Sequence, residues 1–395
     1  MASLLSYVPV VNRFIGTEDA SRSTIDIPPV EIHNVETAPE KRSRTLKHLL
    51  RANHINHSIL YHDMRFHNHL PHILCSAYLL GASDTQLHQV YDEEAKTLEP
   101  WEPSPAEVTQ DDWQSYRGDK RYQRAFVDFF EDALVMRHGY NWKKVVDEYL
   151  FAGKEPLVNC LIGGLGHPLI HLGYAYEMDS KELAMEGLGM ASTEYNFFHK
   201  YLDDPSYTKP SPLKTSNPLE LLTRMANDKR VPDLFQDPGY DNIDPLFQKH
   251  EDLVMEYWNA WTLDDPTNQF QESQEAAVSL LVATVLPGTH SYNFFCCPPT
   301  HNKPRLRQWW LLTVAVYLIF KCPKIDPDNI KPTDVAGKQW NYVEDKALNS
   351  AYSTDAHFVK AIRAIKEAAR TWGDVHEHYL AAAVRFVDDF EGWVF

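Results

Sequence analysis

The sequence predicts an all-α protein, a single multi-helical globular domain preceded by an extended N-terminal arm. Apolar residues recur at the 3.6-residue helical period in about a dozen segments. No segment alternates with the two-residue period of a strand between hairpin turns. The chain of 395 residues is 44% hydrophobic and 12% aromatic, a composition that supports a sizeable core and argues against disorder.

The arm is expected over residues 1–40, where four prolines (Pro9, Pro28, Pro29 and Pro39) are scattered among polar residues. Residues 41–395 are expected to form one helical catalytic domain, because no Pro-rich connection is long or biased enough to separate two domains and no repeat is present. In chain order, helices are predicted over residues 42–61, 73–80, 84–91, 121–136, 142–151, 157–176, 181–202, 218–226, 246–262, 273–286, 307–320, 355–372 and 375–390.

Residue types at the helix ends support these boundaries. Pro71 precedes the second segment, where a proline in the first turn is tolerated, and Gly81 is its expected stop. Asp84 is the expected N-cap of the third segment. The helical period itself is clearest in the first and fourth segments, where large apolar residues fall at Leu46, Leu49, Leu50, Ile55, Ile59, Phe126, Phe129, Phe130, Ala133 and Leu134.

Charge and cysteine usage exclude several function classes. The formal net charge of −17 repels phosphate backbones and anionic lipid, so nucleic-acid binding and membrane-surface binding are not expected. The five cysteines form no CxxC pair, which argues against a disulfide scaffold or a zinc ribbon. The first 16 residues lack the features of a secretory signal, and the apolar run 309–320 is too short to span a bilayer. A buried helix over that run and a cytoplasmic location are expected.

Motifs that hold the common cofactors are missing from the sequence. It contains no GxGxxG after a strand, no P-loop, no GxSxG elbow and no HExxH. The segment Gly163-Gly164-Leu165-Gly166 lacks the dinucleotide spacing and stands in a helical context. We therefore expect an enzyme that works without flavin and without its own nicotinamide site.

Nineteen histidines are the main sequence signal of chemistry, and six of them fall within nineteen positions: His54, His57, His62, His67, His69 and His72. His69 and His72 (i, i+3) should share one helix face, from which His67 would point away. His167 and His171 (i, i+4) share another face, a spacing that suits acid–base work or a metal. The alternatives are a solvated, histidine-rich helix start for the first group and ordinary polar residues of a packed helix for the second.

Further candidates lie in the C-terminal half. His357 and Lys360 (i, i+3) would share a face, although such a lysine could equally face solvent. The aromatic segment 292–295 suits either the core or the wall of a site for a flat polycyclic ligand. Candidate substrate-binding residues are Tyr174, Phe294, Phe295 and His301.

Three blocks taken together resemble the questin oxidase-like family of fungal polyketide pathways: residues 66–82, residues 166–174 and residues 355–360. The family includes the Baeyer–Villiger-type oxygenases of the aflatoxin, geodin and monodictyphenone pathways, and the resemblance runs from about residue 40 to the C-terminus. It implies an oxygenase that opens the central ring of an anthraquinone-type polyketide by inserting oxygen beside a ring carbonyl.

The resemblance also implies two mechanisms. In one, no cofactor is required and the reduced hydroquinone reacts with O2 itself, with His67, His69, His72, His167 and His171 as acid–base groups. In the other, a non-haem iron dioxygenase cleaves a C–C bond, and the ligands would be His69, His167, His171, His301, His357 and a carboxylated Lys360. Iron-type members carry a His-His pair where this chain has His72-Ile73, and the stretch 296–299 also departs from their pattern.

The chemistry of the residues favours the cofactor-free reading. Triplet oxygen reacts slowly with closed-shell molecules unless an electron-rich anion donates an electron, and a neutral imidazole near its ordinary pKa of about 6.5 is suited to generating that anion. A separate NADPH-dependent reductase would supply the hydroquinone. The reading from another class is a non-catalytic polyketide carrier, and the oligomeric state stays open.

Overall fold

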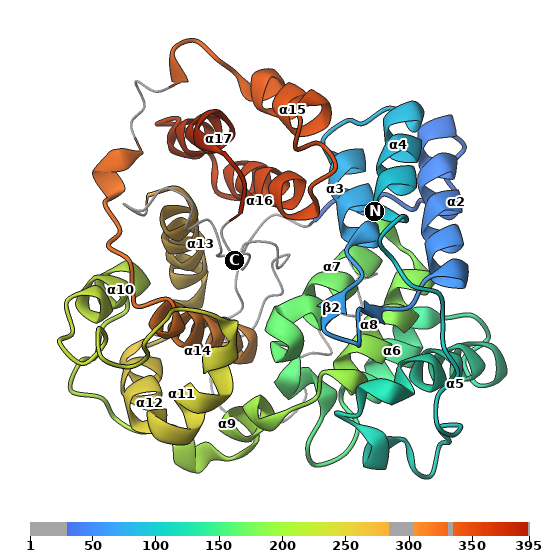
Figure 1. Cartoon of the computed structure of the whole chain (residues 1–395), viewed down its shortest axis with the longest axis horizontal. Helices are drawn as coiled ribbons and strands as arrows, with labels where there is room; N and C mark the ends of the chain where they lie inside the picture. The colour runs from blue at the N-terminus through green and yellow to red at the C-terminus, as the bar shows by residue number, and fades with distance from the viewer. Residues whose placement is uncertain (1–29, 284–302, 331–334, 394–395) are drawn as a thin grey trace, which may run out of the picture.

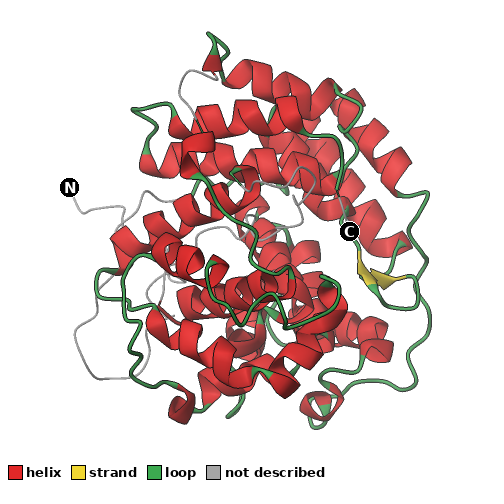
Figure 2. Ribbon diagram, turned by 60° about the vertical axis from the view of Figure 1, so that its left-hand side comes forward, coloured by secondary structure: helices red, strands yellow, loops and turns green. Residues whose placement is uncertain are grey.

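The computed structural model describes residues 30–283, 303–330 and 335–393. It confirms the all-α class: in the described part of the chain, helices are joined by loops and accompanied by one small antiparallel hairpin (Figure 2). The hairpin pairs β1 (Leu60–Tyr61) with β2 (Phe66–His67), with Leu60 opposite His67.

The helices follow one another closely along the chain. The α-helices are α2 (Lys41–Asn56), α3 (Leu70–Leu79), α4 (Asp84–Glu94), α5 (Gln123–Met136), α6 (Trp142–Leu150), α7 (His167–Met178), α8 (Lys181–Thr193), α9 (Lys200–Asp203), α10 (Pro218–Ala226), α11 (Ile243–Lys249), α12 (Glu251–Ala260), α13 (Pro266–Val282), α14 (Lys303–Ile319), α15 (Trp340–Asn349), α16 (Ala356–Trp372) and α17 (His378–Asp389). Short 3-10 turns are η2 (Trp113–Tyr116), η3 (Lys120–Tyr122), η4 (Leu157–Cys160), η5 (Gly163–Gly166), η6 (Phe197–His199), η7 (Pro205–Tyr207), η8 (Tyr240–Asn242) and η10 (Pro327–Asn329).

The buried apolar residues form two large cores. The first core joins helices α2–α8 to α15–α17, and the second joins α9–α14. Figure 1 shows the same grouping, with α10–α14 together at the lower left and α15–α17 above them. Helix α13 contributes to both cores, through Leu281 on one side and Leu280 on the other. Chain segments far apart in sequence therefore build the first core.

The predicted arm falls outside the described residues as far as residue 29. Its last part lies along the end of α7, where the His33 N–H donates to the Glu177 carbonyl and the Val35 N–H donates to that of Met178. Glu36 also pairs with Arg51 on α2, and Val35 is buried in the first core.

The start signals of α3 and α4 are only partly as predicted. Pro71 does stand in the first turn of α3, and the chain turns at Gly81 after the helix. The N-cap of α4 is Ser83, not the predicted Asp84. The Ser83 side chain accepts from the Gln86 N–H and the Gln86 side chain bonds back to the Ser83 N–H. This reciprocal capping satisfies two backbone donors, which Asp84 inside the helix does not do.

The prediction of one helix over residues 157–176 is wrong. Gly164 and Leu165 have positive φ angles of +53° and +57°, and Gly166 follows at +81°, so the chain makes a left-handed turn before α7 begins at His167. Glycine adopts this conformation with little strain. The segment 181–202 likewise ends its first helix at Thr193, and 246–262 divides at His250 into α11 and α12.

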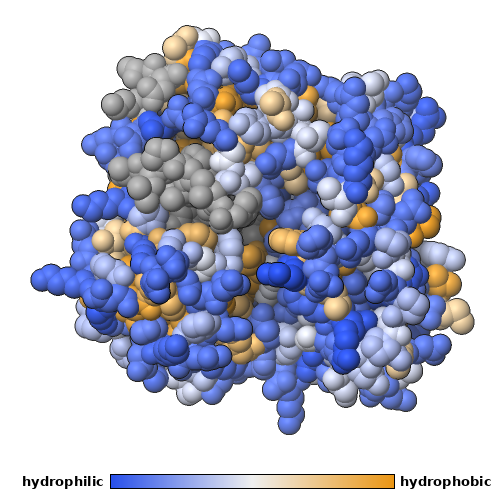
Figure 3. All heavy atoms as spheres, in the orientation of Figure 1, coloured by the Kyte–Doolittle hydropathy of each residue, from blue (hydrophilic) through white to orange (hydrophobic). Residues whose placement is uncertain are grey.

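The apolar run in α14 is a buried helix, as predicted, with Trp310, Leu311 and Val314 fully enclosed. Among the described helices, none combines the length and the apolar character that a membrane span requires. The face drawn in Figure 3 is mostly hydrophilic, with apolar residues in small separate groups. This surface agrees with the acidic, charge-rich composition.

Candidate active site

The N-terminal turns of α3, α7 and α16 meet at a cluster of imidazole rings. His69 is the N-cap of α3 and His72 lies in its first turn, while His167 opens α7 and His171 follows one turn later. His357 is the second residue of α16, and its backbone N–H donates to the side chain of the N-cap Asp355. The ring centroids of His69 lie 4.8 Å from His167 and 4.5 Å from His357. The structure thus brings together the pairs predicted to share helix faces.

One hydrogen-bonded pair joins His167 to His69. The Nδ1 atom of His167 lies 2.6 Å from the carbonyl oxygen of Gly164, and its Nε2 lies 2.8 Å from Nε2 of His69. A carbonyl oxygen only accepts, so Nδ1 of His167 carries a proton. The left-handed turn at Gly164 is what aims that carbonyl back at the first residue of α7.

A second pair joins His171 to His72. The Nε2 atom of His72 lies 3.0 Å from Nδ1 of His171, and Nε2 of His171 lies 2.7 Å from Oε2 of Glu186. Both rings and the carboxylate are fully buried. The remaining nitrogen, Nδ1 of His72, is also buried and has no hydrogen-bond partner among the residues that the structure describes. It is the one ring nitrogen of this pair left for a ligand.

His67 joins the cluster from a different direction than predicted. It lies on β2 and not on a helix, so the helical geometry that would point it away does not apply. Its ring stacks on His167 with centroids 3.9 Å apart and planes 7° from parallel. Its Nε2 bonds Oε1 of Glu194 at 2.9 Å, and Lys120 lies 2.7 Å from the same oxygen. The solvated alternative for the first histidine group is therefore wrong for His67 and His72, which are buried.

Lys360 lies inside the protein, which overturns the alternative that it faces solvent. It is 1% exposed, one turn after His357 on α16. Burial, reinforced by the charge of Lys360, lowers the pKa of each of four histidines well below its ordinary value, and in all but His357 neighbouring histidines add to the effect. The lowered pKa keeps these four histidines (His69, His72, His167 and His357) uncharged at neutral pH.

Of the predicted substrate-binding residues, only Tyr174 is described. It is fully buried on α7, its hydroxyl lies 2.6 Å from Oγ of Ser76, and its ring centroid lies 5.6 Å from that of His72. It borders the histidine cluster through its ring. Phe294, Phe295, His301 and the stretch 296–299 lie outside the described residues.

Sequence reasoning missed the acidic partners of the histidines. Glu186 and Glu194 hold His171 and His67, and His54 holds the other oxygen of Glu186 at 2.8 Å. A signal for Glu186 was present, because it is a lone carboxylate in the otherwise uncharged run 183–191. A buried charge needs a hydrogen-bonding partner, and the nearby histidines are the natural candidates.

The described histidines among the predicted iron ligands lie in the cluster, where several of their ring nitrogens are already hydrogen-bonded. Among the described side chains, no group of three His, Cys, Asp or Glu residues is placed to hold a metal ion. Both nitrogens of His171 are already hydrogen-bonded, one of them to a carboxylate. Of the predicted ligands, His301 lies outside the described residues, and the described ones do not form a three-residue metal site in this arrangement.

Comparison with known proteins places the chain in a family. The sequence model of the questin oxidase-like family matches residues 66–365. The Baeyer-Villiger oxidase AgnL3 of Paecilomyces divaricatus is 32% identical over 37% of this chain and 33% of its own length. A Baeyer-Villiger oxidase of Pestalotiopsis microspora is 25% identical over 83% of this chain and 81% of its own. The questin oxidase of Aspergillus fumigatus is 28% identical over 50% and 46%.

The coverage of the relatives is uneven: the first match spans about a third of that relative, and the questin oxidase match spans about half. The family match, in contrast, includes β2, α3, α7 and the first turns of α16, so it contains every histidine of the cluster. The chain belongs to the questin oxidase-like family of oxidoreductases.

Proposed function

We propose that the protein is an oxygenase of fungal aromatic polyketide biosynthesis that opens the central ring of a reduced anthraquinone by Baeyer–Villiger-type oxidation. The observation that carries the proposal is the buried group of neutral histidines, with Nδ1 of His72 free of any hydrogen bond in the described structure. Relatives named as questin oxidase and Baeyer-Villiger oxidases support the reaction class.

The first step is deprotonation of the hydroquinone. His72 is the base, because its free Nδ1 is buried beside the other rings and its low pKa keeps it unprotonated at neutral pH. The resulting anion is rich enough in electrons to give one to O2. Recombination of the two radicals forms a C–O bond and a substrate peroxide.

The peroxide then inserts one oxygen atom next to a ring carbonyl as its O–O bond breaks, and the second oxygen atom leaves as water. One hydroquinone and one O2 thus give one lactone and one water, and the hydroquinone provides both reducing electrons. The buried Lys360 is placed near His69 and His72 to stabilise negative charge on the oxygen atoms during this step.

This stoichiometry fixes the neighbouring reaction. The hydroquinone must be made from its quinone by a two-electron reduction, which we assign to a separate NADPH-dependent reductase. The acidic chain needs no nucleic acid or membrane partner for this chemistry.

The test uses purified protein, exhaustively chelated and verified to be free of iron. An emodin- or chrysophanol-type anthraquinone is reduced anaerobically, mixed with the protein, and exposed to ¹⁸O2. The expected product is a lactone, or its ring-opened hydrolysis product, carrying one ¹⁸O atom from O2. The matched control is the same mixture with His72→Gln protein, and His88→Gln serves as a variant of an exposed histidine.

Three other outcomes contradict parts of the proposal. Activity that disappears on chelation and returns only with Fe(II) contradicts the cofactor-free mechanism. A substrate that stays bound and unchanged in mass points to a carrier. Full activity of His72→Gln contradicts the assignment of the base.

A further inference from the structure

A buried carboxylate lies directly behind the histidine cluster. Glu186 stands on α8, is 1% exposed, and bonds a histidine with each of its oxygens. Oε2 lies 2.7 Å from Nε2 of His171, and Oε1 lies 2.8 Å from Nδ1 of His54. Two helices on opposite sides, α7 and α2, thus meet at this one side chain.

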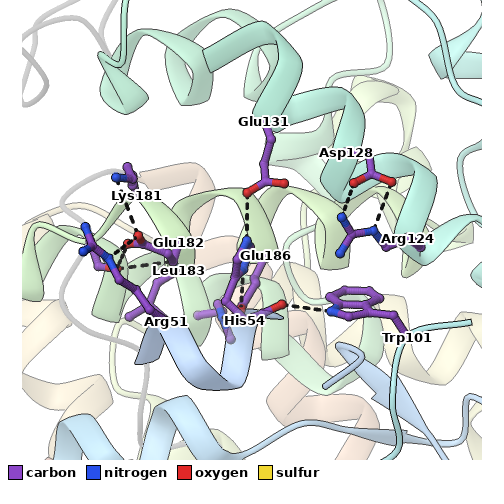
Figure 4. Close-up of polar contacts among 12 residues, drawn as sticks. Arg51, His54, Trp101, Arg124, Asp128, Glu131, Lys181, Glu182, Leu183 and Glu186 are labelled. Atoms are coloured by element: carbon purple, nitrogen blue, oxygen red, sulfur yellow. Dashed lines mark hydrogen bonds and ion pairs between the residues drawn. The ribbon is translucent and has the colours of Figure 1, made fainter. Parts of the chain in front are cut away.

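The line of contacts continues from Glu186 to the protein surface. Nε2 of His54 lies 2.8 Å from Oε1 of Glu131 on α5, whose side chain is 39% exposed (Figure 4). The carbonyl of His54 also accepts from the indole N–H of Trp101, which fixes this part of α2. His54 therefore bridges two carboxylates, one buried and one at the surface.

Charge alternates along this line. Burial alone would lower the pKa of His54, but its hydrogen bonds to Glu131 and Glu186 outweigh that effect and raise it to about 10. Burial would raise the pKa of Glu186, but the bonds from His171 and His54 lower it to about 2. A cationic His54 thus stands between two carboxylates.

The carboxylate of Glu186 determines which ring nitrogen of His171, and through it of His72, carries a proton. A carboxylate only accepts, so Nε2 of His171 carries a proton, and when this is the only proton on the ring its Nδ1 has the lone pair. That lone pair must accept from His72, so Nε2 of His72 carries the proton of this bond. The lone pair of His72 is left on Nδ1, the nitrogen without a partner among the described residues.

We propose that Glu186, anchored by His54, is a positioning residue that selects the reactive tautomer of His72 through His171. The proposal rests on the proposed function for the role of His72 as a base. When Nδ1 of His72 takes a proton, its Nε2 proton moves to Nδ1 of His171. His72 becomes neutral again, and the positive charge on His171 lies against the carboxylate of Glu186.

The isosteric substitution Glu186→Gln should reverse the donor and acceptor roles in the hydrogen bonds of His171 and His72. In Glu186→Gln the cationic His54 still needs an acceptor, so the amide oxygen turns to His54 and the amide NH2 faces His171. Nε2 of His171 must then accept, its Nδ1 carries the proton and donates to Nε2 of His72, and Nδ1 of His72 is protonated. The base is blocked without a change in the volume of the side chain.

The matched control lies one turn earlier on the same helix. Glu182 also reaches α2, where its Oε1 lies 3.0 Å from Nε of Arg51, but no described contact links it to His171 (Figure 4). Glu182→Gln removes the same charge and should leave both His72 and His171 unchanged.

The experiment is ¹⁵N NMR of histidine-labelled full-length protein, in which protonated and unprotonated ring nitrogens give well-separated signals. His72→Gln and His171→Gln assign the two rings. We expect both rings to carry the proton on Nε2 in the wild type and in Glu182→Gln, and on Nδ1 in Glu186→Gln. The kcat of Glu186→Gln should fall by about 10²–10⁴-fold, the contribution of a general base, with little change in KM.

A wild-type spectrum with the His72 proton on Nδ1 overturns the proposal, and this measurement does not depend on whether the variant folds. Loss of activity in Glu186→Gln with unchanged tautomers also overturns it. If the wild type has the expected tautomers but does not oxygenate the hydroquinone, the proposed function fails and the positioning role stands.

Discussion

Individual histidines in this protein differ sharply in charge although they lie close together. His54 is cationic because carboxylates bond both of its nitrogens, whereas His69, His72 and His167 are neutral because they are buried among other rings. Proximity in sequence says nothing of this difference, since His54 and His72 belong to the same run. The charge of each histidine depends on the groups that surround its two ring nitrogens.

The low pKa of His72 predicts the acid side of the pH profile. A base is active while it is unprotonated, so a pKa well below 6.5 keeps His72 active as the pH falls through that value. We expect kcat/KM for the hydroquinone to be flat from pH 8 to pH 6, with its acid limb at lower pH. Initial rates in anaerobically premixed, oxygen-pulsed assays measure this. An acid limb centred near pH 6.5 would contradict the assignment.

The substitution Lys360→Arg distinguishes the cofactor-free mechanism from the iron-dependent one. The cofactor-free enzyme uses its positive charge, which Lys360→Arg keeps, so kcat should stay within about tenfold while the larger group lowers stability by about 1–3 kcal/mol. An enzyme with a carboxylated lysine would lose all activity, because arginine forms no carbamate oxygen donor. Steady-state kinetics and thermal unfolding of the same preparations provide both readouts.

Short elements between the helices help to position two histidines of the cluster, His67 and His167. The turn at Gly164 and Leu165 aims a carbonyl at His167, and the hairpin of β1 and β2 delivers His67 to the same ring. The i, i+4 spacing was sufficient to predict that His167 and His171 share a face. It did not predict the turn, because Leu157, Leu161 and Leu165 continue the apolar period through it.

Gly164 also leaves space that the site needs. A Cβ atom there would stand 2.6 Å from Nε2 of His67 and 2.7 Å from Cδ of Glu194, both too close. Gly164→Ala should therefore displace His67, lower kcat, and cost about 1–3 kcal/mol of stability beyond the backbone strain.

Gly139→Ala is the control for that strain. Gly139 has nearly the same φ angle, +54° against +53°, and no atom within 4 Å of the added methyl group. It should lose about 1–2 kcal/mol, the cost of a left-handed L-residue, and keep full activity. Chemical denaturation and kinetics compare the two variants. Equal losses of stability and activity in both would contradict a steric role for Gly164.

Over the whole molecule, the sequence predicted the fold class and most of the helices, because amphipathic periods are local. For the same reason it predicted that His69 and His72 lie together, and their ring centroids are 5.5 Å apart. It did not predict Glu186, Glu194 or His54 as partners, because those contacts join residues that are 15 to 132 positions apart in the chain. Tertiary contacts of this kind have no local period.

The buried pair of His54 and Glu186 should make global stability depend on pH. The pKa of His54 is raised to about 10 from 6.5, so its stabilisation is complete below pH 6.5 and is lost as the pH rises through 10. The pKa of Glu186 is lowered to about 2 from 4.5, so its stabilisation is complete above pH 4.5 and is lost as the pH falls toward 2. The contribution of the pair is greatest between these limits.

His54→Leu should therefore cost about 3–5 kcal/mol near pH 6, the range for breaking a buried ion pair, and less near pH 10. Urea unfolding of wild type and variant at the two pH values measures the difference. His88→Leu, which changes an exposed histidine on α4, should show no such dependence. A deficit of the same size at both pH values would contradict the charge assigned to His54.

In the order of the chain, the helices of the second core lie between two groups of helices that form the first core. The helices that carry the histidines contribute to the first core, which is built from α2–α8 and α15–α17, and the chain between α8 and α15 builds the second core. In sequence, the predicted substrate-contacting residues Phe294, Phe295 and His301 fall within this intervening segment. A change confined to this segment would therefore alter three of the four residues predicted to contact the substrate, and would leave Tyr174 and the histidine-bearing helices α3, α7 and α16 unchanged.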